Sequence, residues 1–251
     1  MRFRAPKPGR TGPRGASPPE WFLYERPGKE RWVPIRRRTG LDETRALSGL
    51  AGLDAVEWAG LHDAYGPATE VPTLLLAVAV GDEETRSPAW WNLWGRVLHQ
   101  GSVYEATLPT IEPLVALATW GEYPDRPEAL AMLCEAARSD DVRVWRYDGR
   151  GEIVHDETRQ RWLRGALRAA VRDRTAELLG TWREEPDRVR RAQLWMLSSL
   201  PASVGAYREL VDSVLPAEHR EAWRALLVDE DLDEDGSDRI WALEAWVNEP
   251  T

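Results

Sequence analysis

Four side chains able to carry acid–base or hydrogen-bonding chemistry surround Gly101: His99, Gln100, Tyr104 and Glu105. If one helix ends near Gly101 and another follows, these side chains would meet at one end of a helix pair. There they would form a polar recognition site or supply a general acid or base. The alternative is a structural joint in which His99 and Gln100 hydrogen-bond to helix-end backbone groups. No nucleophile or metal partner stands at motif spacing, which favours the joint.

Tryptophan supplies the second group of candidate binding residues, since the chain contains 14 of them. Trp90 and Trp91 are adjacent and cannot face the same way on a helix. We therefore expect one of the two to be partly exposed and to serve as an anchor at an interface. Trp94 is grouped with them as a candidate, although its place on an apolar stripe also suits a core residue.

Asp231, Asp233 and Asp235 form the best candidate for a metal site. The order Asp-x-Asp-x-Asp-Gly places three carboxylates on one side of a turn, as calcium loops require. The twelfth position of such a loop should be a bidentate glutamate, and in this chain it is Ala242. An acidic linker before the last helix is the alternative.

No other pattern predicts catalysis. The histidines His62, His155 and His219 are isolated, and neither a nucleophile motif nor a phosphate loop occurs. We expect no catalytic residue and no cofactor. The single cysteine, Cys134, lies in an apolar helical setting and excludes a disulfide within the chain, in agreement with a cytoplasmic location. No apolar run approaches the ~18 residues that would cross a membrane.

Charge divides the chain into two parts. Residues 1–40 contain 11 Lys or Arg and 3 Asp or Glu, which leaves 22 basic and 39 acidic residues in 41–251. We predict a basic, partly disordered N-terminal arm over 1–40 and a helical domain over 41–251. Within the arm, residues 21–39 suit a short hairpin or an extended segment lying on the domain. Contact with nucleic acid is expected only through this arm.

From about residue 42 the apolar residues recur at helical spacing. Helices are expected near 54–65, 69–80, 82–100, 103–120, 126–138, 157–182, 187–200, 203–213, 216–228 and 238–247. One segment interrupts them, where alternation from Val142 to Tyr147 is followed by Asp148-Gly149 and then by residues 152–155. This pattern predicts a short β-hairpin near 142–155, or an ordered loop.

A repeat in the sequence distinguishes a stack of helix pairs from a helical bundle. Pro72 and Pro113 stand 41 residues apart at matching places in two apolar helices, a spacing typical of HEAT-type units. A third similar segment begins at Pro186-Asp187, where the sequence resembles the HEAT consensus of a Pro-Asp turn leading into Val-Arg-x-Ala. We therefore predict an all-α fold, an α-α superhelix of HEAT-like repeats.

A more specific resemblance lies in Leu93-Trp94-Gly95, His99-Gln100-Gly101 and the segment 103–107 that reads Val-Tyr-Glu-Ala-Thr. These residues resemble a segment of uncharacterised bacterial HEAT-repeat proteins, chiefly from actinobacteria. The resemblance covers roughly residues 54–120. It implies the solenoid fold and carries no settled activity.

Two functions are compatible with this architecture. The first is a non-catalytic scaffold that binds a protein partner, a basic one because the helical domain is acidic. Such a protein would act as an immunity or antitoxin protein, or as an accessory subunit. The alternative is a HEAT-like nucleic-acid-binding protein or a DNA glycosylase-type enzyme, which needs a basic groove. Arginines for it occur between 159 and 174, but nearby carboxylates are the partners we expect for them.

Overall fold

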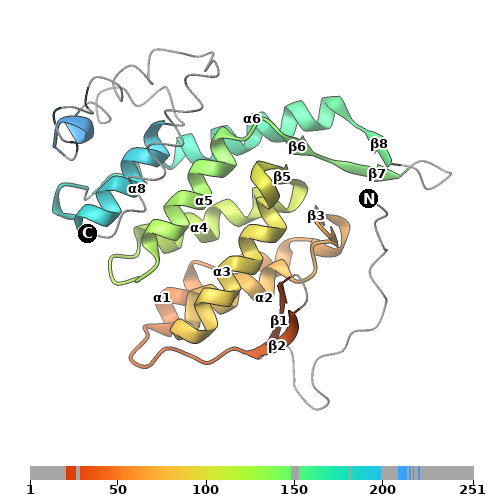
Figure 1. Cartoon of the computed structure of the whole chain (residues 1–251), viewed down its shortest axis with the longest axis horizontal. Coiled ribbons are helices and arrows are strands. Elements are labelled where there is room, and N and C mark those ends of the chain that lie inside the picture. Colours follow the sequence, from red (N-terminus) through yellow and green to blue (C-terminus); the bar gives the residue numbers. More distant parts are fainter. Residues whose placement is uncertain are drawn as a thin grey trace.

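The computed structural model describes residues 21–26, 29–147, 153–180 and 182–198, together with 209–213, 215, 217 and 220. The described residues are mostly helical, as predicted (Figure 1). The α-helices are α1 (Glu43–Ser48), α2 (Val71–Val80), α3 (Glu83–Val97), α4 (Ile111–Thr119), α5 (Arg126–Arg138), α6 (Glu157–Asp173), α7 (Thr175–Leu178) and α8 (Asp187–Ser198). Short 3-10 helices are η1 (Leu53–Ala55), η2 (Trp58–Gly60), η3 (His99–Gly101), η4 (Glu105–Thr110) and η5 (Trp182–Glu184).

Eight short strands form four two-stranded pairs among the described residues. They are β1 (Trp21–Arg26) with β2 (Lys29–Pro34), β3 (His62–Asp63) with β4 (Gly66–Pro67), β5 (Val103–Tyr104) with β6 (Val142–Arg143), and β7 (Trp145–Tyr147) with β8 (Ile153–His155). The first pair is the hairpin alternative predicted for residues 21–39. It packs against α2 and α3, and Val33 is buried there.

The helices α2 and α3 form the first packed pair (Figure 1). Nearly all of α2 is apolar and buried, so it forms the centre of this part of the core. Pro72 is tolerated in its first turn, and Gly81 ends it. A Cβ atom on Gly81 would lie 2.4 Å from the carbonyl oxygen of Ala77, so the sharp turn into α3 requires glycine.

The helix α5 forms the centre of the second half and packs against α4, α6 and α8. Its Cys134 is buried, and the thiol donates to the carbonyl oxygen of Trp195 at 3.4 Å. Arg126, at its start, donates to the carbonyl oxygen of Ala118 and forms a bidentate ion pair with Glu185, each N–O distance being 2.5 Å. This buried pair joins α4, α5 and the segment before α8.

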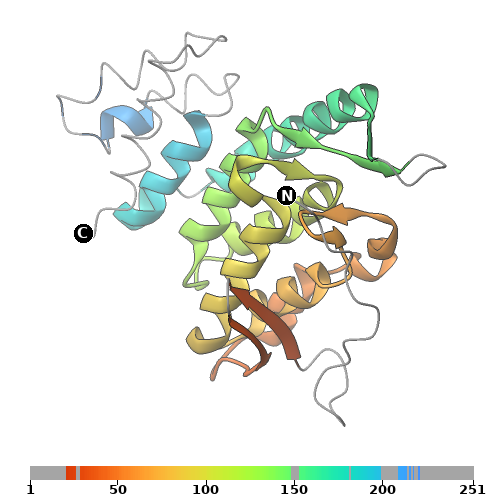
Figure 2. The same cartoon turned by 45° about the vertical axis from the view of Figure 1, so that its right-hand side comes forward.

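The hairpin predicted near 142–155 is present as β7 and β8, which pair antiparallel with Trp145 opposite His155. Figure 2 shows the two strands extending beyond the helices. The preceding residues, Val142 and Arg143, take no part in that hairpin. They instead pair in parallel with β5, which links this segment to the region after α3.

The predicted helix at 54–65 is wrong, since the segment consists of η1, η2 and β3. The indole N–H of Trp58 donates to the carbonyl oxygen of Leu53 at 2.9 Å, and the fully buried Asp63 bonds to Arg96 on α3. These tertiary bonds hold the backbone in turns, so they override the helical spacing.

The expected helix at 103–120 is also corrected, because only its second half, α4, is α-helical. The Thr107 hydroxyl accepts from the backbone N–H of Tyr104 and donates to the carbonyl oxygen of Val97, which fixes a 3-10 segment before α4. The helix expected at 157–182 breaks at Arg174 into α6 and α7. The helices expected at 216–228 and 238–247 lie outside the described residues, apart from isolated positions.

Two features of the predicted architecture remain predictions. Neighbouring helices pack in pairs, but the HEAT-like superhelical stack is not established by that pairing. The division of the chain at residue 40 is likewise untested. Within the described residues, no helix combines the length and apolar character needed to span a membrane.

Candidate binding site on the exposed face of α3

The helix α3 begins at a well-formed N-terminal cap and presents one long exposed face. The Asp82 carboxylate accepts from the backbone N–H of Thr85 at 2.9 Å, as a capping residue does. Glu84, Ser87 and Trp91 then follow at three- and four-residue spacing and are all exposed. Fifteen residues give the helix a length of about 22 Å. This face is long enough to contact an extended segment of a partner.

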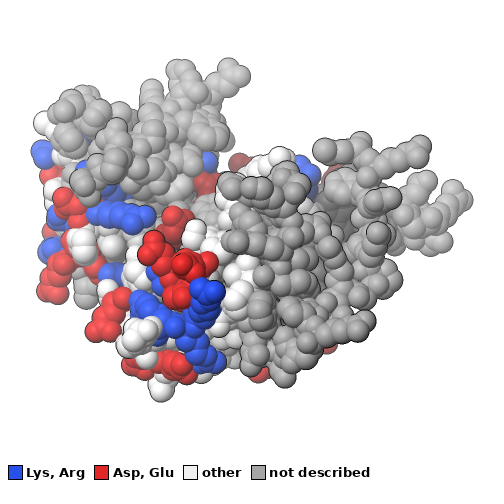
Figure 3. Space-filling model, turned by 60° about the horizontal axis from the view of Figure 1, so that its bottom comes forward, with Lys and Arg blue, Asp and Glu red and all other residues white. Residues whose placement is uncertain are grey.

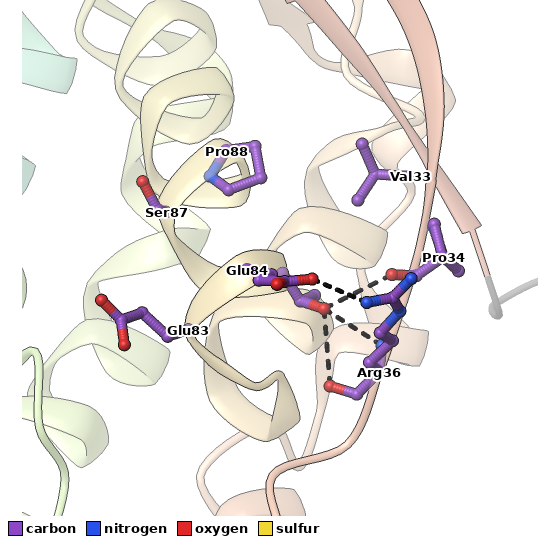
Figure 4. Close-up of a pocket in the computed structure, with 8 residues that line it drawn as sticks. Val33, Pro34, Arg36, Glu83, Glu84, Ser87 and Pro88 are labelled. Atoms are coloured by element: carbon purple, nitrogen blue, oxygen red, sulfur yellow. Dashed lines mark hydrogen bonds and ion pairs between the residues drawn. The ribbon is translucent and has the colours of Figure 1, made fainter.

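An open groove of about 690 Å³ lies beside the first turns of α3 (Figure 4). Val33 and Pro34 of β2 line one side, and Ser87 and Pro88 of α3 line the other. Arg36 closes the end of the groove, where its guanidinium lies 2.6 Å from the Glu84 carboxylate. In Figure 4 the Glu83 side chain points away from Arg36.

Trp91 is the exposed member of the adjacent tryptophan pair, with 52% of its surface accessible. Trp90 is buried, and its indole N–H donates to the Asp125 carboxylate at 3.0 Å. Trp94 is half-buried and donates to the Glu128 carboxylate. The prediction that one of Trp90 and Trp91 is exposed is therefore confirmed. An exposed indole beside a groove is typical of an interface anchor.

The turn after α3 holds an unusual backbone conformation at its tip. Gln100 is exposed and has φ 53° and ψ 39°, in the left-handed region that non-glycine residues rarely adopt. Gly101 follows with φ 80°, and its carbonyl oxygen accepts a hydrogen bond from Ser139 Oγ at 2.6 Å. The strained tip thus presents the Gln100 side chain to solvent, next to His99.

His99 lies against Tyr65, the last residue of the helix that was predicted over 54–65. The Tyr65 hydroxyl lies 3.4 Å from His99 Nδ1, and the two rings meet edge to face. Tyr65 is 51% exposed, and its hydroxyl would lie 3.6 Å from a Cβ atom on Gly95. Tyr65 therefore continues the exposed face of α3 beyond Trp91. Sequence reasoning missed this role because Tyr65 is distant in the chain.

A buried ion pair holds Tyr65 in this place. Asp63 is fully buried and lies 2.9 Å from the Arg96 guanidinium, which in turn stacks over the Tyr65 ring at 5.6 Å. The Asp63 carboxylate also accepts from the backbone N–H of Tyr65 at 2.8 Å. Burial raises the pKa of Asp63 above its ordinary value, and the neighbouring Arg96 offsets part of that rise.

Tyr104 and Glu105 lie inside the protein, whereas His99 and Gln100 reach the surface. Glu105 is 5% exposed, lies 3.2 Å from Arg159 Nε and 3.6 Å from His62 Nδ1, and therefore ties β3 and η4 to α6. Burial raises the pKa of the Tyr104 hydroxyl. The four side chains around Gly101 thus divide into a buried pair, Tyr104 and Glu105, and a pair at the surface, in which Gln100 is exposed and His99 is half-buried.

We call the resulting surface the α3 strip. It comprises Glu84, Ser87, Pro88, Trp91, Gly95, Tyr65 and His99, with the groove at its acidic end. Aromatic anchors in a row with hydrogen-bonding groups at one end suit recognition of a macromolecular segment. Among the residues with described positions, no group of three or more His, Cys, Asp or Glu side chains is placed to share a metal ion. Asp231, Asp233 and Asp235 lie outside the described residues.

Arginines on α6 and at its C-terminal cap mostly pair with carboxylates. Arg168 lies 3.0 Å from Asp140, which also lies 3.5 Å from Arg164, and Arg174 lies 2.9 Å from Glu112. The expectation of local pairing is confirmed for these residues. On a different face, the one at the bottom of Figure 1, Figure 3 also shows acidic and basic side chains interleaved over the described residues. These arginines therefore do not form a continuous basic groove.

Comparison with known proteins returns no relative: no family model, no curated protein and no solved structure matches the chain. The resemblance to bacterial HEAT-repeat proteins consequently rests on the quoted residues alone and stays a prediction. The α3 strip is therefore interpreted from its own geometry.

Proposed function

We propose that the protein is a non-catalytic scaffold that binds a protein partner along the α3 strip. The observation that carries this proposal is the row formed by the exposed Trp91, the half-exposed Tyr65 and the groove beside α3. Truncation of such anchors typically removes a large share of binding free energy. The HEAT-like stacking of helix pairs belongs to the proposal as the frame that would present this surface.

The partner that fits best is a basic protein. Residues 41–251 hold 39 acidic and 22 basic residues, and Glu83 and Glu84 line the groove together with Arg36. A negative field of this kind accelerates encounter with a positively charged partner and disfavours acidic ones. Binding a basic partner in the cytoplasm would suit an immunity or accessory role for this protein. This role is the more specific part of the proposal.

The experiment is quantitative affinity capture with three forms of the full chain. Wild type, the double variant W91A/Y65A and the control L47A would be incubated with nuclease-treated lysate of the source cells. Leu47 is a suitable control because it is an exposed apolar residue on α1. The proposal expects a basic protein retained by wild type and L47A but lost from the double variant. Retention of the same proteins by all three forms contradicts it.

A further inference from the structure

The turn between α3 and β5 places a strained residue at the end of the α3 strip (Figure 1). Gln100 follows His99, and among the described residues it is the one non-glycine residue with a positive φ. Residues with a side chain rarely adopt this left-handed conformation, because their Cβ atom lies too close to the backbone carbonyl oxygen. Glycine adopts such a conformation without that cost, as Gly101 does at the next position. The folded chain therefore keeps a glutamine where the backbone favours glycine.

The segment after α5 holds this turn in its strained conformation. Ser139 Oγ donates to the carbonyl oxygen of Gly101 at 2.6 Å. Ser102 Oγ donates to the Asp141 carboxylate at 2.5 Å, and β5 then pairs in parallel with β6. These bonds fasten the residues that follow Gln100 to a second part of the chain, so a local rearrangement does not relieve the strain. The position of the Gln100 backbone is consequently fixed.

The Gln100 side chain takes no part in the bonds that hold the turn. It is exposed, and within the described part of the chain its amide makes no hydrogen bond. A side-chain amide offers two N–H donors and an accepting carbonyl oxygen. The strained residue thus presents available hydrogen-bonding groups to solvent, next to the contact between His99 and Tyr65.

We infer that Gln100 is a specificity-determining residue of the α3 strip, and that its amide hydrogen-bonds to the backbone of an extended segment of the partner. In an extended strand the N–H and C=O groups of one residue point to the same side. A single glutamine amide can therefore accept from one of these groups and donate to the other. Glycine at this position would relieve the strain but would lack the amide. The inference rests on the proposed scaffold function and specifies that main-chain groups of the partner are bound at this end of the strip.

The test uses a display library of random peptides as the probe. Peptides retained by the full-length wild-type chain are depleted on W91A/Y65A, which leaves those that bind the α3 strip. Their affinities are then measured for Q100A, Q100G and the control Q160A, all as full chains. Gln160 is a suitable control because it is a half-buried glutamine on α6.

The inference expects Q100A and Q100G each to weaken peptide binding by about tenfold, because two hydrogen bonds are lost. Q160A should keep the affinity of wild type. Thermal melting separates this loss from unfolding, since Q100G should melt at a higher temperature than wild type although it binds more weakly. A residue that only shaped the turn would change stability and affinity in the same direction.

A scan of N-methylated peptides identifies the backbone group that Gln100 contacts. Methylation of that N–H should weaken binding to wild type by about fivefold. It should leave binding to Q100A nearly unchanged, since both changes remove the same bond. The inference is overturned if Q100A binds as tightly as wild type, or if every methylated peptide loses the same factor on both chains. A selection that yields no peptide dependent on Trp91 and Tyr65 contradicts the scaffold function and this inference with it, so the two failures are distinguishable.

Discussion

The Tyr65 hydroxyl lies 3.4 Å from Nδ1 of His99, although 34 positions separate the two residues. Two bonds bring the segment before α2 to the end of α3. They are the buried ion pair between Asp63 and Arg96 and the hydrogen bond from the backbone N–H of Ala64 to the carbonyl oxygen of Arg96, at 2.9 Å. The exposed end of the α3 strip therefore depends on a buried interaction beneath it.

Replacement of Arg96 by methionine should destabilise the protein strongly. The fully buried Asp63 carboxylate would lose its cation, and removal of one partner of a buried pair typically costs about 3–5 kcal/mol. The matched control is E84Q, which breaks the exposed pair with Arg36 and should cost less than about 1 kcal/mol. Urea denaturation measures both free energies of unfolding. Equal losses for the two variants would contradict this account of the ion pair.

The strained turn predicts a stabilising substitution. Gln100 adopts a left-handed conformation that costs a non-glycine residue about 1–2 kcal/mol, so Q100G should raise the free energy of unfolding. The greater freedom of glycine in the unfolded chain reduces the net gain to about 0.5–1 kcal/mol. Q100A keeps the strain and should leave stability unchanged. Thermal melting of wild type, Q100A and Q100G tests this prediction. A Q100G variant less stable than wild type would refute the strain argument.

The adjacent tryptophans should respond differently to truncation. W90A removes a buried side chain and its hydrogen bond to Asp125, and should cost about 3–5 kcal/mol of unfolding free energy. W91A removes a half-exposed side chain and should cost less than about 1 kcal/mol. Denaturant titration with circular dichroism measures both. Similar losses at the two positions would show that Trp91 is a core residue and not a surface anchor.

Glu128 predicts a pH dependence of stability. Burial raises the pKa of its carboxyl above 4.5, so the folded state takes up a proton before the unfolded state does as the pH falls. The charged form therefore costs stability above the folded pKa, and this cost disappears below pH 4.5. E128Q should be more stable than wild type at about pH 7, with a difference that shrinks toward acid. Melting temperatures of the two forms across this range test it, and a difference that grows toward acid has the wrong sign.

The sequence is sufficient to predict most of the local helices and strands, but it is not sufficient to predict the residues of the candidate site. Apolar spacing located α2, α5 and α8 because each buries a continuous stripe, and the alternation after Val142 located the β7–β8 hairpin. The segment at 54–65 has similar spacing, but its conformation depends on the bond between Asp63 and Arg96, two residues that no local pattern connects. The same ion pair places Tyr65 beside the end of α3, where it forms part of the α3 strip. A non-local ion pair therefore accounts for both the wrong helix and the missed site residue.

The most direct test of the central claim is the affinity of a captured partner for the α3 strip. Titration calorimetry would compare wild type, W91A and the control L47A, all as full chains, against the purified partner. Truncation of an interface anchor should cost more than about 1.4 kcal/mol, which weakens binding by at least about tenfold. The account predicts this loss for W91A and unchanged affinity for L47A. Equal affinity of all three forms would contradict the assignment of the α3 strip as the binding surface.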